Sequence, residues 1–161
     1  MIISAAELTV NPANGKRVHK GEPFTGVAQK LHANGRVAES DAYVDGLRHG
    51  PSQIWFADGQ KSYEMHFENG LREGVAQTWW SNGLLRSQTE FVRDKPEGAA
   101  WVWYASGETF KRHFYKSGVP TGLQKAWRKN GKLYENFEIR NGRSYGLRNT
   151  KICVEIKDQS V

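Results

Sequence analysis

One interval, 24 residues, organises the glycines of this chain. Three glycine series keep this interval, and the only interruption is Asp94, which stands where the third series needs another glycine. The series are Gly26, Gly50, Gly74, Gly98, Gly122 and Gly146; Gly35, Gly59, Gly83, Gly107 and Gly131; and Gly46, Gly70, Gly118 and Gly142. Series that stay in phase over five units without an insertion indicate a tandem array of one supersecondary element.

Each unit has the pattern of a β-hairpin. Gly26 opens a short segment that ends at Asn34-Gly35, and dipeptides of this kind favour tight hairpin turns. A second segment follows and ends at a polar turn such as Asp45-Gly46. Segments of six to eight residues are too short for typical helices and have the usual length of strands. We therefore expect an all-β fold, an elongated twisted antiparallel meander of ten repeat strands in a single layer, which at about 4.8 Å per strand spans roughly 50 Å.

The composition favours a thin, extended sheet. Hydrophobic residues make up 38% of the 161 residues, below the usual share of about 45–50% in globular domains. Disorder would also lower this share, but the 6 Trp, 6 Tyr and 7 Phe argue against it, because disordered chains are poor in aromatic residues. The single cysteine, Cys153, cannot form an internal disulfide, and its apolar neighbours Ile152 and Val154 predict a buried thiol.

The sequence predicts one repeat domain over residues 1–161, made of an N-terminal cap (1–25), five repeats (26–145) and a C-terminal capping strand (146–161). We expect extra strands at residues 7–10 and 16–19, and a strand at 151–156 that covers the open sheet edge. The first residues lack the basic and apolar regions of a signal peptide, and no apolar run approaches the ~18 residues of a membrane span. A native start at Met1 favours the cytoplasm. Removal of a leader would instead favour the periplasm or a membrane-associated location.

Three stretches resemble a known repeat. They are Pro23-Phe24-Thr25-Gly26, the aromatic-x-x-Asn-Gly turn from Trp79 to Gly83, and the stretch from Tyr43 to Gly50. Over residues 14–146 the chain resembles the MORN-repeat variant of bacterial proteins, an antitoxin-like family. This resemblance implies a twisted β-sheet used for protein or lipid contacts, and it brings no catalytic residues. Asp94 departs from the pattern, as do Lys95 and Pro96, which are expected in the third closing turn.

Two adjacent positions of the repeat gather aromatic side chains. The first column is Leu31, Trp55, Trp79, Trp103 and Trp127, and the second is His32, Phe56, Trp80, Tyr104 and Arg128. A two-residue turn would pair Trp79 with Arg86 and place the tryptophan column opposite the column of Tyr43, Phe67 and Phe91. A three-residue turn with a left-handed glycine would pair Trp79 with Leu85. We favour the second, which predicts that the tryptophan column and the column of Tyr43, Phe67 and Phe91 share one face. Polar side chains such as Arg86, Gln88, Glu90, Glu64 and Arg112 are then expected on the other face.

These columns supply the candidate binding residues Trp55, Trp79, Trp103, Trp127, Phe56, Trp80 and Tyr104. The tryptophans either form the core strip that keeps the hairpins stacked or form an exposed surface that a second copy or another protein covers. The trio Phe56, Trp80 and Tyr104 is expected on the opposite face. There it forms either an exposed contact patch or a strip packed under the terminal segments.

The net charge of +6 is concentrated at one end of the array. Residues 122–151 hold only two acidic side chains, Glu135 and Glu138, so this stretch alone accounts for the excess. The candidate basic patch is Lys125, Arg128, Lys129, Lys132, Arg140, Arg143, Arg148 and Lys151. It is either a solvated cap or a site for an anionic partner, namely an acidic protein surface or an anionic membrane. Nucleic acid is the least favoured partner because no nucleic-acid motif is present.

No pattern indicates catalysis. The five histidines fall at different phases of the repeat, and none has metal-ligand spacing. The glycines follow the turns and do not form a phosphate-binding loop. The sequence thus predicts a protein without enzymatic activity, cofactor or metal, a scaffold that binds another protein such as a toxin or effector, in the manner of an antitoxin or immunity protein. The alternative is a peripheral module that binds anionic lipid through its basic end.

Overall fold

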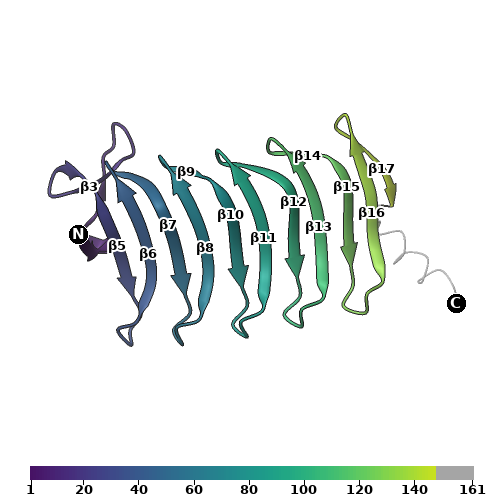
Figure 1. Ribbon diagram of the computed structural model, residues 1–161, viewed down its shortest axis with the longest axis horizontal. Helices are drawn as coiled ribbons and strands as arrows, with labels where there is room; N and C mark the ends of the chain where they lie inside the picture. The colour runs from purple at the N-terminus through teal and green to yellow at the C-terminus, as the bar shows by residue number, and fades with distance from the viewer. Residues whose placement is uncertain (148–161) are drawn as a thin grey trace, which may run out of the picture.

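Most of the fold is one long β-sheet. A computed structural model describes residues 1–147, in which hairpins follow one another along the sheet in chain order (Figure 1). The repeat strands are β5 (Gly26–Leu31), β6 (Val37–Val44), β7 (Leu47–Trp55), β8 (Lys61–Glu68), β10 (Gly74–Trp79), β11 (Leu85–Val92), β12 (Lys95–Trp103), β13 (Thr109–Lys116), β15 (Gly122–Trp127) and β16 (Leu133–Arg140). Two short strands, β9 (Leu71–Arg72) and β14 (Val119–Pro120), precede β10 and β15 and pair with β8 and β13. The predicted antiparallel meander of ten repeat strands is confirmed.

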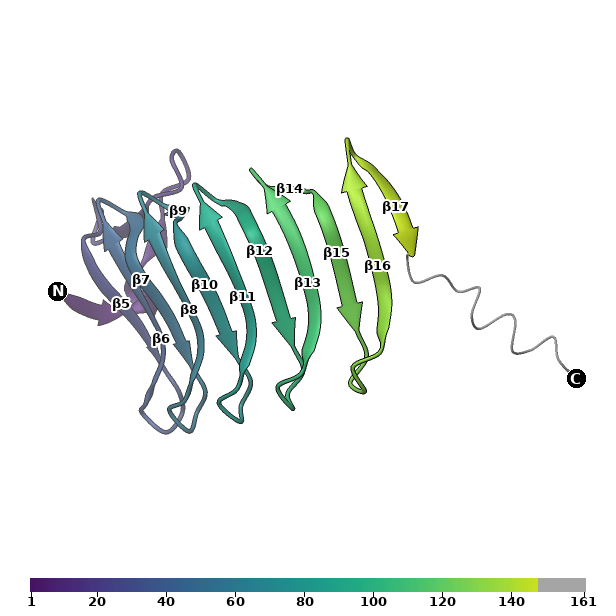
Figure 2. The ribbon, with the colours of Figure 1, turned by 45° about the vertical axis from the view of Figure 1, so that its right-hand side comes forward.

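Both ends of the sheet have an added strand. At the start, β1 (Ile2–Ser4) pairs with β5 in parallel, with Ile3 opposite Ala28, a strand that the sequence pattern did not predict. At the other end, β17 (Arg143–Leu147) pairs with β16 and begins within the turn region of the last repeat. Figure 2 shows the sheet from β5 to β17 as one continuous layer. The strand expected at 151–156, with Cys153, falls outside the described residues.

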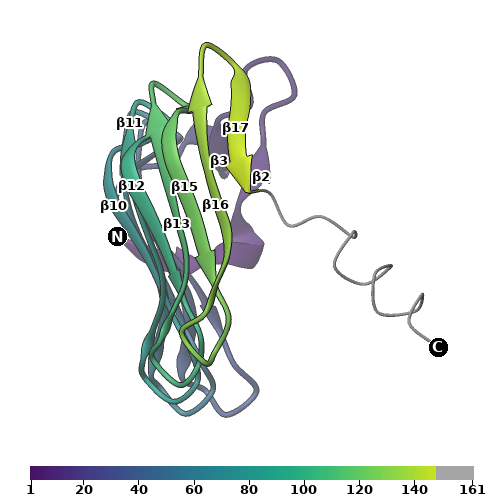
Figure 3. The ribbon, with the colours of Figure 1, turned by 90° about the vertical axis from the view of Figure 1, so that its right-hand side faces the viewer.

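The N-terminal segment forms a small second layer. After the 3-10 helix η1 (Ala5–Glu7), strands β2 (Thr9–Val10), β3 (Arg17–His19) and β4 (Glu22–Pro23) make a separate three-stranded sheet, as expected for residues 7–10 and 16–19. Viewed along the sheet, this segment lies to one side of the bowed strands (Figure 3). Buried Phe24 packs with Ala28 and Tyr43, and Ile3, Ala5 and Leu8 pack around them. Burial of these side chains fixes the segment on the first hairpin.

Within each hairpin the turn has three residues. In the third unit, the Trp80 amide donates to the Leu84 carbonyl (2.8 Å) and the Gly83 amide donates to the Trp80 carbonyl (2.9 Å). Gly83 has a φ of +82°, a left-handed conformation that favours glycine. Trp79 pairs with Leu85, so the predicted three-residue turn is confirmed.

Between hairpins the turn has two residues, both left-handed. Asp45 (φ +49°) and Gly46 (φ +76°) connect the paired residues Val44 and Leu47, which is the geometry of a type I′ turn. The third unit keeps this geometry without glycine, because Arg93 and Asp94 have φ values of +48° and +68°. Lys95 and Pro96 belong to strand β12 instead of the turn, and Pro96 pairs with Phe91.

The prediction that the tryptophan column shares a face with the column of Tyr43, Phe67 and Phe91 is wrong. Thr78 pairs with Ser87 while Trp79 pairs with Leu85, so Arg86 is an extra residue on β11. This β-bulge cancels the offset that the three-residue turn introduces. By alternation along β10 and β11, Trp79 shares a face with Gln77 and Gln88, whereas Phe91 shares the opposite face with Ser87.

The sheet therefore has two distinct faces. The tryptophan face contains Trp55, Trp79, Trp103, Trp127 and a straight row of residues across the strands: Gln29, Ser40, Gln53, Glu64, Gln77, Gln88, Trp101, Arg112, Lys125 and Asn136. The capped face, on the side of the N-terminal segment, contains the buried residues Ala28, Asp41, Tyr43, Ser52, Met65 and Phe67. Bulky Phe67 lies opposite Gly50 on this face, so glycine leaves room for the ring.

Candidate functional site

The row across the tryptophan face is internally hydrogen-bonded in the first three repeats. The Gln53 amide donates to the Glu64 carboxylate (2.5 Å), and the Gln77 amide donates to Gln88 (2.9 Å). Lys61 also donates to Glu64 (2.9 Å). The hydrogen bond from Lys61, followed by that from Gln53, holds the pKa of Glu64 below its usual value despite partial desolvation. In this part of the row the polar side chains are hydrogen-bonded to one another, and the charge of Glu64 is balanced by Lys61.

The same row changes character in the last two repeats. Trp101 replaces glutamine, and its indole stacks on that of Trp103 at 6.1 Å with an interplanar angle of 10°. The Arg112 guanidinium lies 5.5 Å from the Trp101 ring centroid and 5.1 Å from that of Phe114. Arg112 stands directly opposite Lys125, and Lys125 opposite Asn136. The row here consists of cations among aromatic rings.

The structure brings the four predicted tryptophans Trp55, Trp79, Trp103 and Trp127 to this one face, and each is half-buried. The Lys61 ammonium lies 5.8 Å from the Trp79 centroid, a favourable cation–π distance. Exposed Val75 and Leu31 lie on the same face, at 46% and 56% exposure. The tryptophans thus pack along the sheet and still present part of each ring to the solvent.

The second aromatic column links successive hairpins. The Trp80 indole N–H donates to the Trp103 carbonyl (3.2 Å), and the Tyr104 hydroxyl donates to the Trp127 carbonyl (2.9 Å). A ring nitrogen of His32 lies 2.9 Å from the Trp55 carbonyl. Phe56 occupies the same position without a polar atom. The trio Phe56, Trp80 and Tyr104 is half-buried at the edge of three-residue turns, an arrangement that differs from both an open patch and a strip under the terminal segments.

The predicted basic residues are divided among three places. Arg128, Lys129 and Lys132 surround the last three-residue turn, where the Lys129 ammonium lies 5.8 Å from the Tyr104 centroid. Arg140 and Arg143 flank the opposite, two-residue turn, and Arg140 pairs with Glu138 at 2.5 Å. Lys125 lies between them on the tryptophan face. Arg148 and Lys151 lie beyond the described residues.

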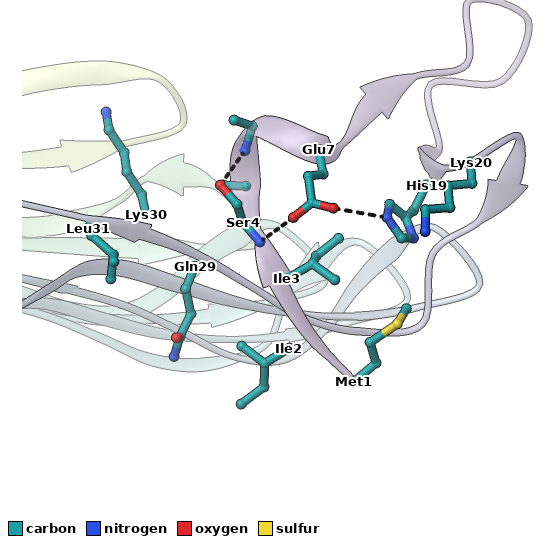
Figure 4. A pocket seen from close by; sticks show the side chains of 12 residues that line it. Met1, Ile2, Ile3, Ser4, Glu7, His19, Lys20, Gln29, Lys30 and Leu31 are labelled. Atoms are coloured by element: carbon teal, nitrogen blue, oxygen red, sulfur yellow. Dashed lines mark hydrogen bonds and ion pairs between the residues drawn. The ribbon is translucent and has the colours of Figure 1, made fainter. Parts of the chain in front are cut away.

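A cavity of about 1000 Å³ lies at the N-terminal edge, between β1, η1 and the end of β5 (Figure 4). Its side chains include Ile2, Ile3 and Leu31 on the apolar side. Glu7 closes a capping box, since its carboxylate accepts the Ser4 amide (3.0 Å) and lies 3.3 Å from the Nε2 atom of His19. The sequence reasoning missed this cavity because β1 was not predicted, and the Ser-x-x-Glu pattern of residues 4–7 was the available signal.

A polar cluster on the capped face is structural. Buried Asp41 accepts hydrogen bonds from Arg48 (2.7 Å) and from the Tyr43 hydroxyl (3.3 Å), and the Arg48 guanidinium lies 5.3 Å from the Phe67 centroid. Burial, followed by the Asp41 charge, raises the pKa of Tyr43. Arg72 lies over Phe91 in the same way at 4.2 Å, so one unit later the same stacking recurs.

The described residues form an extended surface and do not gather metal-ligating side chains. Within residues 1–147, His, Cys, Asp and Glu nowhere gather in a group of three that could hold a metal ion. The helical segment η1 is three residues long, and the described chain includes no helix that could cross a membrane. The described chain presents a line of four tryptophans beside the row of polar residues, and in the last two repeats this row contains the cations Arg112 and Lys125.

Comparison with known proteins agrees with this architecture. No curated protein matches the chain. Residues 48–69 match the MORN repeat variant, and this stretch comprises most of β7, the three-residue turn and β8. The matched hairpin has the same phase, turns and bulge as the hairpins before and after it. The matched hairpin is therefore similar to the MORN repeat variant, and the other hairpins of the described chain have the same architecture.

Proposed function

We propose that this protein is a non-enzymatic scaffold that binds another protein through its tryptophan face. The supporting observation is that Trp55, Trp79, Trp103 and Trp127 lie in one line on a face without a second layer. Among the described residues, each strand from β10 to β16 packs chiefly against its neighbours in the sheet. Half-exposed indoles beside arginine and lysine have the composition of protein interfaces, where tryptophan and arginine dominate the binding energy.

The rigidity of the sheet supports the same proposal. Backbone pairing along each hairpin and hydrogen bonds between hairpins hold the indoles in fixed relative positions. A preorganised surface loses little conformational entropy on binding. The finer form of the proposal is an antitoxin or immunity-type role, in which the bound partner is a toxin or effector whose activity is blocked.

Co-purification with two matched variants tests this proposal. Val75→Lys adds a charge to the tryptophan face at an exposed position, and Val10→Lys adds the same charge in β2 of the N-terminal segment, where Val10 is 50% exposed. A partner captured from the native source by the wild-type chain should be lost with Val75→Lys and retained with Val10→Lys. Equal capture by all three chains would reject the tryptophan face as the binding surface.

The same face is also suited to a second copy of the chain, since apolar sheet faces are commonly covered by self-association. In analytical ultracentrifugation a homodimer formed through this face would dissociate in Val75→Lys. A strict monomer at all concentrations would exclude this form of partner.

A second candidate function is binding to anionic lipid, favoured by the exposed Arg128, Lys129 and Lys132 around one turn. Each basic residue near an anionic membrane contributes about 1 kcal/mol. Flotation with vesicles that contain phosphatidylserine, but not with phosphatidylcholine vesicles alone, would support it. Absence of flotation at low salt would exclude it.

A further inference from the structure

We propose that Arg112 and Lys125, between the indoles of Trp101 and Trp127, form a carboxylate-binding site for an acidic segment of a partner protein. The site rests on the proposed scaffold function and names the chemistry of the partner. A cavity of about 270 Å³ opens here on the tryptophan face. It is lined by Trp101, Glu108, Thr109, Arg112, Trp127 and Gly131.

The pairing register places two cations side by side, and one of them, Arg112, lines this cavity. Arg112 lies on β13 directly opposite Lys125 on β15. Like charges directly opposite each other on one face of an antiparallel pair are destabilising. Within residues 1–147, the side chains of Lys125 and Arg112 form no ion pair, so an acidic side chain of the described chain does not balance either charge.

The earlier repeats show what a balanced row looks like. The residues equivalent to Lys125 are Gln53 and Gln77, which donate hydrogen bonds to Glu64 and Gln88. Only at the last two repeats does the row lose these bonds. In the described part of the chain, three buried side-chain polar atoms have no partner. Asp41 Oδ1 lies on the capped face, and the other two are Arg112 Nε and the Asn136 side-chain oxygen. Both belong to this row, so the unsatisfied groups coincide with the unbalanced charge.

The unsatisfied groups are complementary to a peptide. The two cations require an anion, and a carboxylate can accept from the planar guanidinium and the ammonium together. The Asn136 oxygen requires a donor, which the backbone N–H of a peptide supplies and a phosphodiester lacks. The walls formed by Trp101 and Trp127 are suited to an apolar side chain adjacent to the acid. An acidic, partly apolar peptide segment is therefore the favoured occupant, with its carboxylate at Arg112 and its apolar side chain at the indoles.

Nuclear magnetic resonance of the indole N–H groups in the full chain tests the site. The probe is an acetylated, amidated peptide of sequence Asp-Phe-Glu-Phe-Asp, and its neutral counterpart is Asn-Phe-Gln-Phe-Asn. We expect the acidic peptide to shift the indole signals of Trp101 and Trp127, and to leave those of Trp55 and Trp79 in place. The neutral peptide should bind at least about tenfold more weakly, which corresponds to about 1.4 kcal/mol.

The variant Arg112→Gln/Lys125→Gln gives these two positions the glutamines found in the equivalent positions of an earlier repeat, Gln88 and Gln77. It should fold as the wild type does, and its affinity for the acidic peptide should fall at least about tenfold. Lys61→Gln is the matched control, because it removes a cation beside Trp79 on the same face. Binding to this control should equal that of the wild type.

Several results would overturn the site. These are equal shifts at all indoles, equal binding of the neutral peptide, unchanged binding to the double variant, and displacement of the peptide by equimolar inorganic phosphate. If these occur while the contrast between Val75→Lys and Val10→Lys stands, the carboxylate site fails and the scaffold remains. If the peptide binds as expected while the two variants capture the partner equally, the carboxylate site stands. The proposal that the partner is captured through the row of tryptophans is then rejected.

Discussion

At the residue scale, the turn at Arg93 and Asp94 shows how one side chain can replace a glycine. A left-handed non-glycine residue costs roughly 1–2 kcal/mol, and aspartate tolerates the conformation better than most residues. Asp94 also accepts hydrogen bonds from the Arg72 amide (3.0 Å) and the Arg72 Nε atom (2.8 Å). These contacts tie the third closing turn to the preceding one and offset the strain. The side-chain hydrogen bond from Arg72 is the main reason why the pKa of Asp94 lies below its usual value.

This pKa direction predicts the effect of Asp94→Asn. Because the folded pKa is depressed, the ion pair stabilises the fold above the unfolded pKa of about 3.9, and this stability is lost as the pH falls through the folded pKa. Asp94 is 43% exposed, so solvent screening limits the loss in Asp94→Asn to less than about 1 kcal/mol at pH 7. Urea unfolding of the wild type and of Asp94→Asn at pH 7 and at pH 2 measures this difference in the free energy of unfolding. A difference of equal size at both values would mean that turn conformation, not the ion pair, is responsible.

At the element scale, neighbouring hairpins are joined by side chains at the three-residue turns. The Asn82 amide donates to the Ala105 carbonyl (2.6 Å), and Asn34 donates to Ala57 in the same way (2.8 Å). The oxygen of Asn82 meanwhile accepts the Leu84 amide within its own turn (3.1 Å). Asn130 accepts the Lys132 amide (3.1 Å), but its hairpin is the last of the array. Inside the array, Asn82 therefore bonds both within its own turn and to the next hairpin. Within residues 1–147, Asn130 of the last hairpin bonds only within its own turn.

Substitution with aspartate separates these roles, because a carboxylate keeps the acceptor and loses the donor. We expect Asn82→Asp to lower the free energy of unfolding by about 0.5–1.5 kcal/mol, the usual value of one hydrogen bond. Asn130→Asp should have little effect on stability. Thermal unfolding of the two variants at pH 7 gives the comparison, and equal losses would show that the bond between hairpins contributes nothing.

The hairpins also show the limit of prediction from sequence. The glycine phase predicts every repeat strand and both kinds of turn, since a left-handed backbone has few residue types to choose from. Which side chains share a face could not be predicted, because it depends on the bulge at Arg86. This bulge is a feature of backbone pairing, and no particular residue type in the sequence marks it. The charge pattern identified Lys125 as a member of a basic end. Its neighbour Arg112 became a candidate only when the register placed the two side chains together.

At the scale of the whole molecule, apolar burial is uneven along the array. The fully buried hydrophobic residues cluster in the N-terminal half, with a smaller group near the last hairpin. They are Phe24, Ala28, Ala38, Tyr43, Met65 and Phe67 in the first group, and Ala126 and Phe137 in the second. Between residues 68 and 123 every side chain is partly exposed. Because each hairpin contacts chiefly its neighbours, the stability of such an array is close to a sum of local terms.

Hydrogen exchange should therefore be slowest in β6, β7 and β8 and faster in β11, β12 and β13, although all six strands are paired on both sides. Met65 is fully buried, and Met65→Ala should cost about 2–5 kcal/mol. The variant should lose protection in β6–β8 and keep it in β15 and β16, since β10 to β13 lie between β8 and β15 in the sheet. Exchange resolved by mass spectrometry measures both effects. A uniform loss of protection from β5 to β16 would instead show that the sheet unfolds as one cooperative unit, in which a partner bound at Arg112 would also stabilise the first hairpin.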